Sequence, residues 1–217
     1  MKDIDPHADQ PIEAAGAPPQ VAEAAVVLLH GRGDSPEGIL RLVDDIYQRG
    51  VRYLAPGAAG RVWFPGGFDA PLTDRRQAYL TSAFGQVDAA LDRAASFGIG
   101  PDRTVLVGFS QGACVAAEYA VSSSRRYGGL AVLAGGLLGP DPAEPDRRGD
   151  LDGTPAYVAA GADDPHVTPE RVRATAAVLD RQGAEARSEV IPDLGHVISD
   201  AQVAAVTDLL GVVDGGE

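Results

Sequence analysis

A buried strand that leads directly into a glycine–serine–glycine turn is the feature that most constrains this chain. Residues 104–107 form an apolar strand, Gly108-x-Ser110-x-Gly112 follows at once, and residues 113–121 form an apolar helix. In a strand–turn–helix of this kind the serine sits at the tip of a strained turn, and a side chain at either glycine would collide with its surroundings. The motif arises easily by chance in a glycine-rich chain, so the flanking strand and helix carry the inference. Together they predict a nucleophilic serine.

Apolar strands alternate with amphipathic helices along the rest of the chain. This order predicts an α/β fold with a mostly parallel central sheet and helices on both faces. Residues 1–20 are expected to form a flexible tail or a short edge strand near 10–14, and residues 21–217 a single domain. Strands are expected at 24–29, 51–55, 104–107, 129–134, 156–160 and 186–191. One helix is expected to begin near residue 36, and further helices are expected at 74–97, 113–121, 168–181 and 200–210.

The first of these helices is expected to be a single element that begins near Pro36. Proline suits the first turn of a helix. The apolar residues that fall on one face of this helix are Ile39, Leu40, Val43 and Ile46.

The composition excludes several classes of function. The chain has 18 basic and 31 acidic residues, and its net charge of −13 repels nucleic-acid phosphates and anionic lipid headgroups. Cys114 is the only cysteine, which excludes an internal disulfide and a multi-cysteine metal centre. No apolar stretch approaches the ~20 residues of a membrane span, and the first residues lack the apolar segment of a secretory signal. We therefore expect a cytoplasmic protein with no nucleic-acid partner and no membrane span.

A serine hydroxyl needs a base to attack a carbonyl carbon, and the chain has 4 histidines to supply one. His7 lies in the expected tail. His30 precedes Ser110, against the chain order of serine, acid and histidine, and His166 lies on the loop that should supply the acid. His196 follows the last strand, where a loop can bring its imidazole to the serine. His196 is therefore the predicted base.

The acid that orients this base should follow a strand placed between the serine and the histidine in the chain. The strand expected at 156–160 runs into a glycine, an alanine, Asp163, Asp164 and a proline. Asp164 is the predicted acid, although spacing alone does not separate it from Asp163, and both residue types are common in turns. The two aspartates with His166 would have poor geometry for a metal ion, so no metal is expected.

Two backbone N–H groups should stabilise the oxyanion that forms on attack. One is predicted at Gln111, directly after the serine and at a helix N-terminus. The other is predicted at Arg32, in the glycine-bearing loop that follows the first long strand. An ordinary tight turn is the alternative for that loop, and His30 is interpreted as a structural histidine that braces it.

Trp63, Phe64 and Phe68 lie in a long loop over residues 56–71 that is rich in glycine and proline. Such a group of aromatic residues either closes the core or lines a substrate pocket, and both roles stay open. Cys114 lies four residues beyond the serine on a helix and is predicted to be a small buried hydrophobic residue.

Four segments of the chain together resemble the phospholipase/carboxylesterase family of α/β-hydrolases, which includes acyl-protein thioesterases and bacterial carboxylesterases. The resemblance extends from about Val26 to Leu210, and the Gly-Phe-Ser-Gln-Gly block is its most specific part. The four segments are 28–34, 108–113, 161–167 and 195–196.

The resemblance implies an α/β-hydrolase fold without a large cap domain, and it implies roles for individual residues. Ser110, Asp164 and His196 would form a catalytic triad, and the amides of Arg32 and Gln111 the oxyanion hole. The Trp63-Phe64 pair resembles the aromatic step that these enzymes place beside the acyl pocket. In many thioesterase members an aspartate follows this pair, whereas this chain has Pro65, so the pocket is expected to differ.

The implied activity is hydrolysis of carboxylic esters of small to medium chain length, without a metal or an organic cofactor. The alternatives are a thioesterase or lysophospholipase with the same triad, and a non-catalytic binding protein with this fold. The oligomeric state, monomer or homodimer, stays open.

Overall fold

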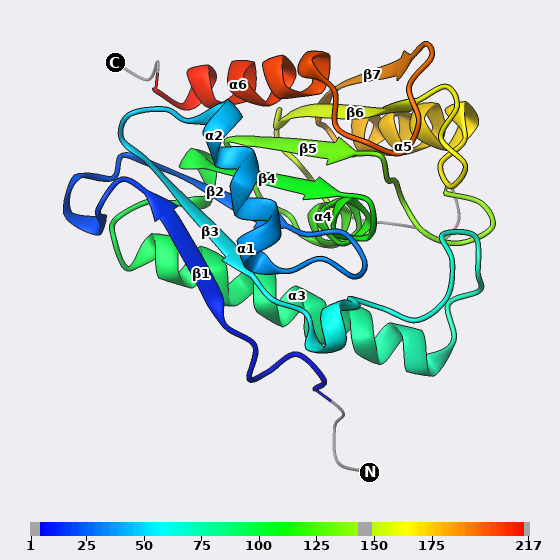
Figure 1. The fold of residues 1–217 in the computed structure, drawn as a ribbon, viewed down its shortest axis with the longest axis horizontal. Coiled ribbons are helices and arrows are strands. Elements are labelled where there is room, and N and C mark those ends of the chain that lie inside the picture. The colour runs from blue at the N-terminus through cyan, green and yellow to red at the C-terminus, as the bar shows by residue number, and fades with distance from the viewer. Residues whose placement is uncertain (1–4, 143–148, 215–217) are drawn as a thin grey trace.

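The chain folds around one seven-stranded sheet, as the alternation of strands and helices predicts (Figure 1). The computed structural model describes residues 5–142 and 149–214. The edge strand β1 is antiparallel to its neighbour β3, and all other neighbouring strands are parallel. The predicted α/β-hydrolase architecture is confirmed. In spatial order the strands are β1 (Ile12–Gly16), β3 (Val51–Pro56), β2 (Ala24–Leu29), β4 (Thr104–Phe109), β5 (Gly129–Leu133), β6 (Pro155–Gly161) and β7 (Glu185–Ile191).

Helices cover both faces of the sheet (Figure 1). α3, α4 and α5 share one buried apolar cluster with one face, and α1, α2 and α6 share a second cluster with the other. None of the helices in the described ranges is long and apolar enough to span a membrane. Their bounds are α1 (Pro36–Ile39), α2 (Val43–Ile46), α3 (Asp74–Ala95), α4 (Gln111–Ser122), α5 (Pro169–Arg181) and α6 (Asp200–Asp214).

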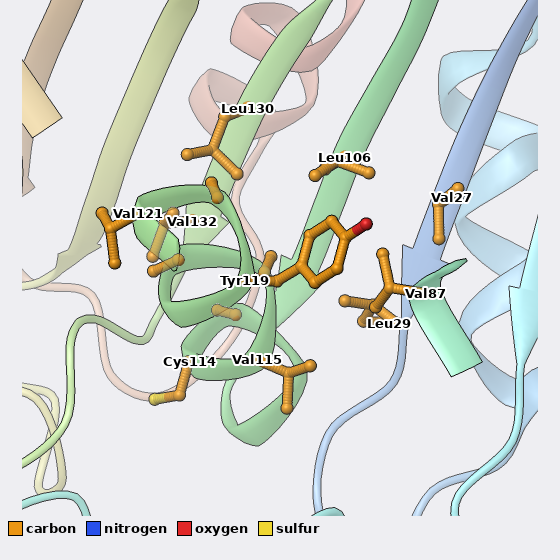
Figure 2. Packing of buried hydrophobic residues seen from close by; sticks show 14 of the residues in the cluster. Val27, Leu29, Val87, Leu106, Cys114, Val115, Tyr119, Val121, Leu130 and Val132 are labelled. Carbon is orange, nitrogen blue, oxygen red and sulfur yellow. The ribbon is translucent and has the colours of Figure 1, made fainter. Parts of the chain in front are cut away.

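The continuous apolar run of β2 is explained by burial on both faces of the sheet. Val27 and Leu29 point into the cluster that contains α4, where Figure 2 shows them on the same side of the sheet as Tyr119. Val26 and Leu28 point into the opposite cluster. All four aliphatic side chains are fully buried. Burial of a side chain of this size contributes about 1.5–3 kcal/mol, so the central strands hold the two helical layers together.

The segment after Pro36 is not the single helix that the sequence predicts. α1 ends at Ile39, a 3₁₀ turn covers Leu40–Leu42, and α2 begins at Val43. A 3₁₀ turn places residues three apart on the same side. Leu42 is therefore buried together with Ile39, while Leu40 is only partly buried. The predicted apolar face is present, but because of the tighter turn it includes Leu42 in place of Leu40.

Of the two alternatives for the N-terminal segment, a flexible tail or a short edge strand, the structure has the edge strand. Residues 12–16 form the edge strand β1, two residues later than predicted. His7 is fully buried, and its backbone N–H donates to Ser82 Oγ at 2.8 Å. Its Nδ1 accepts from the Ala59 amide at 3.1 Å, so its Nε2–H donates to the Trp63 carbonyl at 3.0 Å. The segment therefore braces the loop that carries the aromatic residues.

His30 is a buried structural histidine at the end of β2, as predicted. Its Nε2 accepts from the Ala58 amide at 3.3 Å, and its Nδ1–H donates to the Gly31 carbonyl at 2.8 Å. The indole N–H of Trp63 donates to the His30 carbonyl at 2.8 Å. These bonds join the loop after β2 to the loop after β3.

Acidification should destabilise the protein through its two buried histidines. Burial lowers the pKa of His7 and of His30 below the usual 6.5, because the charged imidazolium would lose its hydration there. Below pH 6.5 the unfolded chain then binds protons that the folded chain does not. Their contribution to stability is complete above that pH and is lost as the pH falls toward the folded pKa values. Urea unfolding between about pH 7.5 and 5.5 should show a loss of up to about 1.4 kcal/mol per pH unit for each histidine.

The His7→Gln and His30→Gln variants test the origin of this slope. Each should be less stable at neutral pH, because buried hydrogen bonds are lost, and each should show a flatter dependence on pH. His166→Gln is the matched control, because the His166 side chain is exposed and makes none of these buried hydrogen bonds. An unchanged slope in both buried-histidine variants would contradict the account.

Candidate active site

The serine of the motif occupies a strained turn between β4 and α4. Ser110 has φ 54° and ψ −116°, a backbone conformation that residues other than glycine rarely adopt. Its backbone N–H donates to the Leu133 carbonyl of β5 at 2.9 Å. Because the turn reverses the chain within one residue, the hydroxyl projects from the carboxyl end of β4.

The two motif glycines permit this turn by close packing. A Cβ on Gly108 would collide with backbone atoms of Gly112 and Ala113, and a Cβ on Gly112 would collide with the Leu29 carbonyl of β2. The atoms that each Cβ would meet belong to the backbone, so they cannot rotate away as a side chain could. The predicted reason for the glycine spacing is therefore confirmed.

Three of the predicted site residues meet at this turn. His196 Nε2 lies 2.8 Å from Ser110 Oγ, and His196 Nδ1 lies 2.7 Å from Asp164 Oδ2. The rings of Phe109 and His166 lie 5.2 and 4.9 Å from the His196 ring and restrict its orientation. Asp164 follows β6 and His196 follows β7. Parallel strands end at one edge of a sheet, which is why residues so far apart in sequence converge there.

The structure separates the two adjacent aspartates. The Asp164 side chain is fully buried, and its Oδ1 accepts from the amides of His166 at 2.8 Å and Val167 at 3.1 Å. Both oxygens are therefore held, one by the turn and one by the imidazole. Asp163 is exposed, and its backbone N–H donates to the Leu194 carbonyl at 3.0 Å. Asp163 thus belongs to the turn.

Gly161 is a site-building residue that the sequence analysis did not single out. It ends β6, and a Cβ there would collide with the carbonyls of Leu194 and Gly195. The absence of a side chain brings the loop that carries His196 against the end of β6. Its position at the end of an apolar run, two residues before Asp163, was the signal in the sequence.

A cavity of about 620 Å³ opens beside Ser110. Phe64 and Phe68 line it, as the pocket interpretation predicts, but Trp63 does not. Trp63 is fully buried, and its indole donates a hydrogen bond to the loop after β2, so of the two roles left open for it the structure has the core one, not the predicted substrate contact. The cavity is lined by Arg32, Phe64, Gly66, Gly67, Phe68, Asp69, Ser110, Gln111, Pro165, His166, Thr168, Arg171 and His196.

Both residues predicted to supply oxyanion-hole amides line this cavity. Gln111 begins α4, and the loop before Arg32 approaches the serine so closely that a Cβ on Gly31 would lie 3.5 Å from Ser110 Cβ. Within the described residues, neither amide has a hydrogen-bond acceptor in the protein. Two such amides at a helix N-terminus and a facing loop can stabilise negative charge that develops beside the serine.

The Gln111 side chain has a role that the sequence did not reveal. Its Oε1 accepts from the Trp63 amide at 2.8 Å, and its Nε2 donates to the Phe64 carbonyl at 2.7 Å. Gln111 therefore fixes the aromatic loop to the turn that carries the serine.

A family model for phospholipases and carboxylesterases matches residues 10–213 of this chain. The chain belongs to the phospholipase/carboxylesterase family. The structure of a phospholipase/carboxylesterase from Dyadobacter fermentans is similar with a TM-score of 0.86 and 33% identity, covering 93% of this chain and 96% of that one.

Two curated relatives of this family member are more distant. A probable SOBER1-like carboxylesterase of Arabidopsis thaliana is 28% identical over 200 residues, which are 84% of this chain and 76% of that protein. The esterase YpfH of Escherichia coli is 26% identical over 204 residues, which are 89% of this chain and 84% of that protein.

Cys114 is a poor candidate for chemistry in this family member. It is fully buried in α4, and burial raises the pKa of its thiol to about 12. A thiol with this pKa is protonated at neutral pH, which agrees with the predicted role as a small hydrophobic residue. No group of three or more histidine, cysteine or acidic side chains in the described ranges is placed to hold a metal ion.

Gly112→Ala should damage both folding and the position of Ser110. Its Cβ would strike the Leu29 carbonyl, so α4 would have to move away from β2. We expect a loss of about 1–3 kcal/mol in urea unfolding. We also expect a loss of about 10²-fold in ester hydrolysis, because a shift of about 1 Å misplaces the hydroxyl.

Gly85→Ala is the matched control for this substitution. Gly85 lies on the exposed side of α3 and a Cβ there meets nothing within 4 Å. This variant should gain about 0.5–1 kcal/mol, because alanine loses less chain entropy in a helix. Wild-type stability and turnover in Gly112→Ala would show that the close packing at the turn is not required.

Proposed function

We propose that this protein is a serine esterase that hydrolyses carboxylic esters of small to medium chain length through an acyl-enzyme intermediate. The observation that carries the proposal is the pair of hydrogen bonds that joins Ser110 to His196 and His196 to Asp164. A serine hydroxyl becomes a nucleophile when a base lies within about 2.6–3.2 Å and a third group orients that base. The family, and relatives named carboxylesterase and esterase, support the same reaction.

In the first half-reaction Ser110 Oγ attacks the ester carbonyl carbon while His196 Nε2 takes its proton. The carbonyl oxygen becomes an oxyanion that the amides of Arg32 and Gln111 stabilise. When the tetrahedral intermediate collapses, the bond to the leaving alcohol breaks and His196 donates the proton to that alcohol. The acyl group remains on Ser110.

In the second half-reaction a water molecule replaces the alcohol. His196 takes a proton from this water as its oxygen attacks the acyl carbon, and the same two amides stabilise the second oxyanion. Collapse breaks the bond to Ser110 Oγ, which recovers its proton from His196, and the carboxylic acid leaves. Throughout, Asp164 holds the Nδ1–H of His196 and so keeps Nε2 directed at the serine.

The size of the cavity supports the proposed chain length. A volume of about 620 Å³ lies in the range of sites for small molecules. Phe64 and Phe68 give this cavity an apolar wall, against which each buried methylene of a substrate contributes about 0.8 kcal/mol. Short and medium acyl or alcohol groups therefore gain binding energy within it.

Asp164→Asn should abolish most of the activity without unfolding the protein. The amide would favour the wrong tautomer of His196, so that Nε2 no longer accepts the proton of Ser110. We expect kcat for an ester such as 4-nitrophenyl butyrate to fall by about 10⁴-fold. The measurement is the initial rate, corrected with Ser110→Ala as the blank.

Asp163→Asn is the matched control, because Asp163 is adjacent in sequence and exposed in the turn. Its rate should stay within a few-fold of the wild type. A large loss of activity in Asp163→Asn with a small loss in Asp164→Asn would show that Asp163, and not Asp164, is the acid. Full activity in Ser110→Ala would refute the serine mechanism itself.

A further inference from the structure

Two arginine side chains from separate elements line the cavity beside Ser110. Arg32 follows β2, and Arg171 lies in the first turn of α5, where Thr168 caps the helix by accepting from the Arg171 amide at 3.3 Å. The protein as a whole is strongly acidic, with a net charge of −13. Positive charge in this cavity is therefore a local feature that the overall composition does not predict.

Backbone carbonyls hold both guanidinium groups in place. Arg32 Nη2 donates to the carbonyls of Phe64 at 3.3 Å and Gly66 at 2.5 Å. Arg171 donates through Nη1 to Leu137 at 2.5 Å and through Nη2 to Gly139 at 2.9 Å.

The two loops that hold these arginines are themselves joined, because the Gly139 amide donates to the Phe68 carbonyl at 3.0 Å. The two cations are thus fixed on one continuous part of the cavity wall.

Carbonyl oxygens orient a guanidinium but do not cancel its charge. Among the ion pairs between described residues, which are Arg173–Glu170, Arg187–Asp208 and His196–Asp164, neither cavity arginine takes part. Among the described residues that line the cavity, Asp69 is the only carboxylate, and it is exposed. The two guanidinium groups therefore outnumber the carboxylates among the described lining residues.

We propose that the natural ester carries a carboxylate, which Arg32 and Arg171 bind while Ser110 attacks the ester carbonyl. This proposal rests on the proposed esterase function and names its substrate class: half-esters of short dicarboxylic acids, or esters of short hydroxy acids. A guanidinium recognises a carboxylate through paired N–H donors, and charge-assisted bonds of this kind are stronger than neutral ones. The cavity volume of about 620 Å³ accommodates such small molecules.

The test compares each anionic ester with a neutral analogue of the same shape. On the acyl side the pair is monoethyl adipate and the corresponding ethyl adipamate. On the alcohol side it is 4-acetoxybutanoate and 4-acetoxybutanamide. At low ionic strength the wild type should prefer the anionic member of at least one pair by about ten-fold or more in kcat/KM. The pair that shows the preference identifies the side of the ester that bears the charge.

Arg171→Gln should reduce this anionic-to-neutral ratio by about ten-fold, and Arg171→Lys should reduce it less. A purely structural role for Arg171 would change both rates alike and leave the ratio unchanged. Arg173→Gln is the matched control: Arg173 lies on the same helix, is exposed and pairs with Glu170 outside the cavity. If Arg171→Gln does not fold, Arg32→Gln gives the same ratio test.

A wild-type ratio of one or below in both pairs, or an unchanged ratio in the folded arginine variants, overturns the anionic-substrate proposal. In that case Ser110-dependent hydrolysis of the neutral esters would leave the esterase function standing.

A binding measurement tests the carboxylate site independently of the proposed esterase activity. If no ester is cleaved, a rise in melting temperature of Ser110→Ala with adipate but not adipamide, lost in Arg171→Gln, would support the anion site alone. No such rise would overturn it.

Discussion

The site depends on one strained residue. Ser110 keeps a positive φ because α4 packs so closely on the ends of β4 and β2 that a side chain at Gly108 or Gly112 would collide with backbone atoms. Backbone strain of this kind costs about 1–3 kcal/mol and persists only where the surrounding packing enforces it. Here the central strands and α4 supply that packing through a shared apolar cluster. The core of the protein thereby holds Ser110, the proposed nucleophile, in place.

Everything else in the site is arranged around this turn by loops at the same edge of the sheet. The loop after β6 supplies Asp164, and the loop after β7 supplies His196, which Gly161 allows to pack closely. On the other side, Gln111 joins the serine turn to the aromatic loop through two hydrogen bonds. The sheet thus positions residues that lie on loops, and a few hydrogen bonds from side chain to backbone fix those loops in place.

The sequence predicted the fold and the reacting groups because both follow from local patterns. Apolar runs marked the strands, and chain order after those strands placed His196 and the Asp163–Asp164 pair at the serine, while the choice between the two aspartates needed the structure. Contacts set by tertiary packing were not predictable in this way. The burial of Trp63 depends on His7, which composition assigned to a flexible tail, and an aromatic residue in a loop suits a pocket and a core equally. The position of Arg171 likewise depends on carbonyls more than thirty residues away.

Labelling with a fluorophosphonate tests the central claim most directly, because this reagent forms a covalent bond only with an activated serine. The account predicts one adduct per chain, found by intact-mass and peptide mass spectrometry on Ser110. The adduct should be absent in Ser110→Ala and in urea-unfolded protein, and it should form far more slowly in Asp164→Asn. Failure of the folded wild-type protein to react, or an adduct on another residue that persists in Ser110→Ala, would contradict the account.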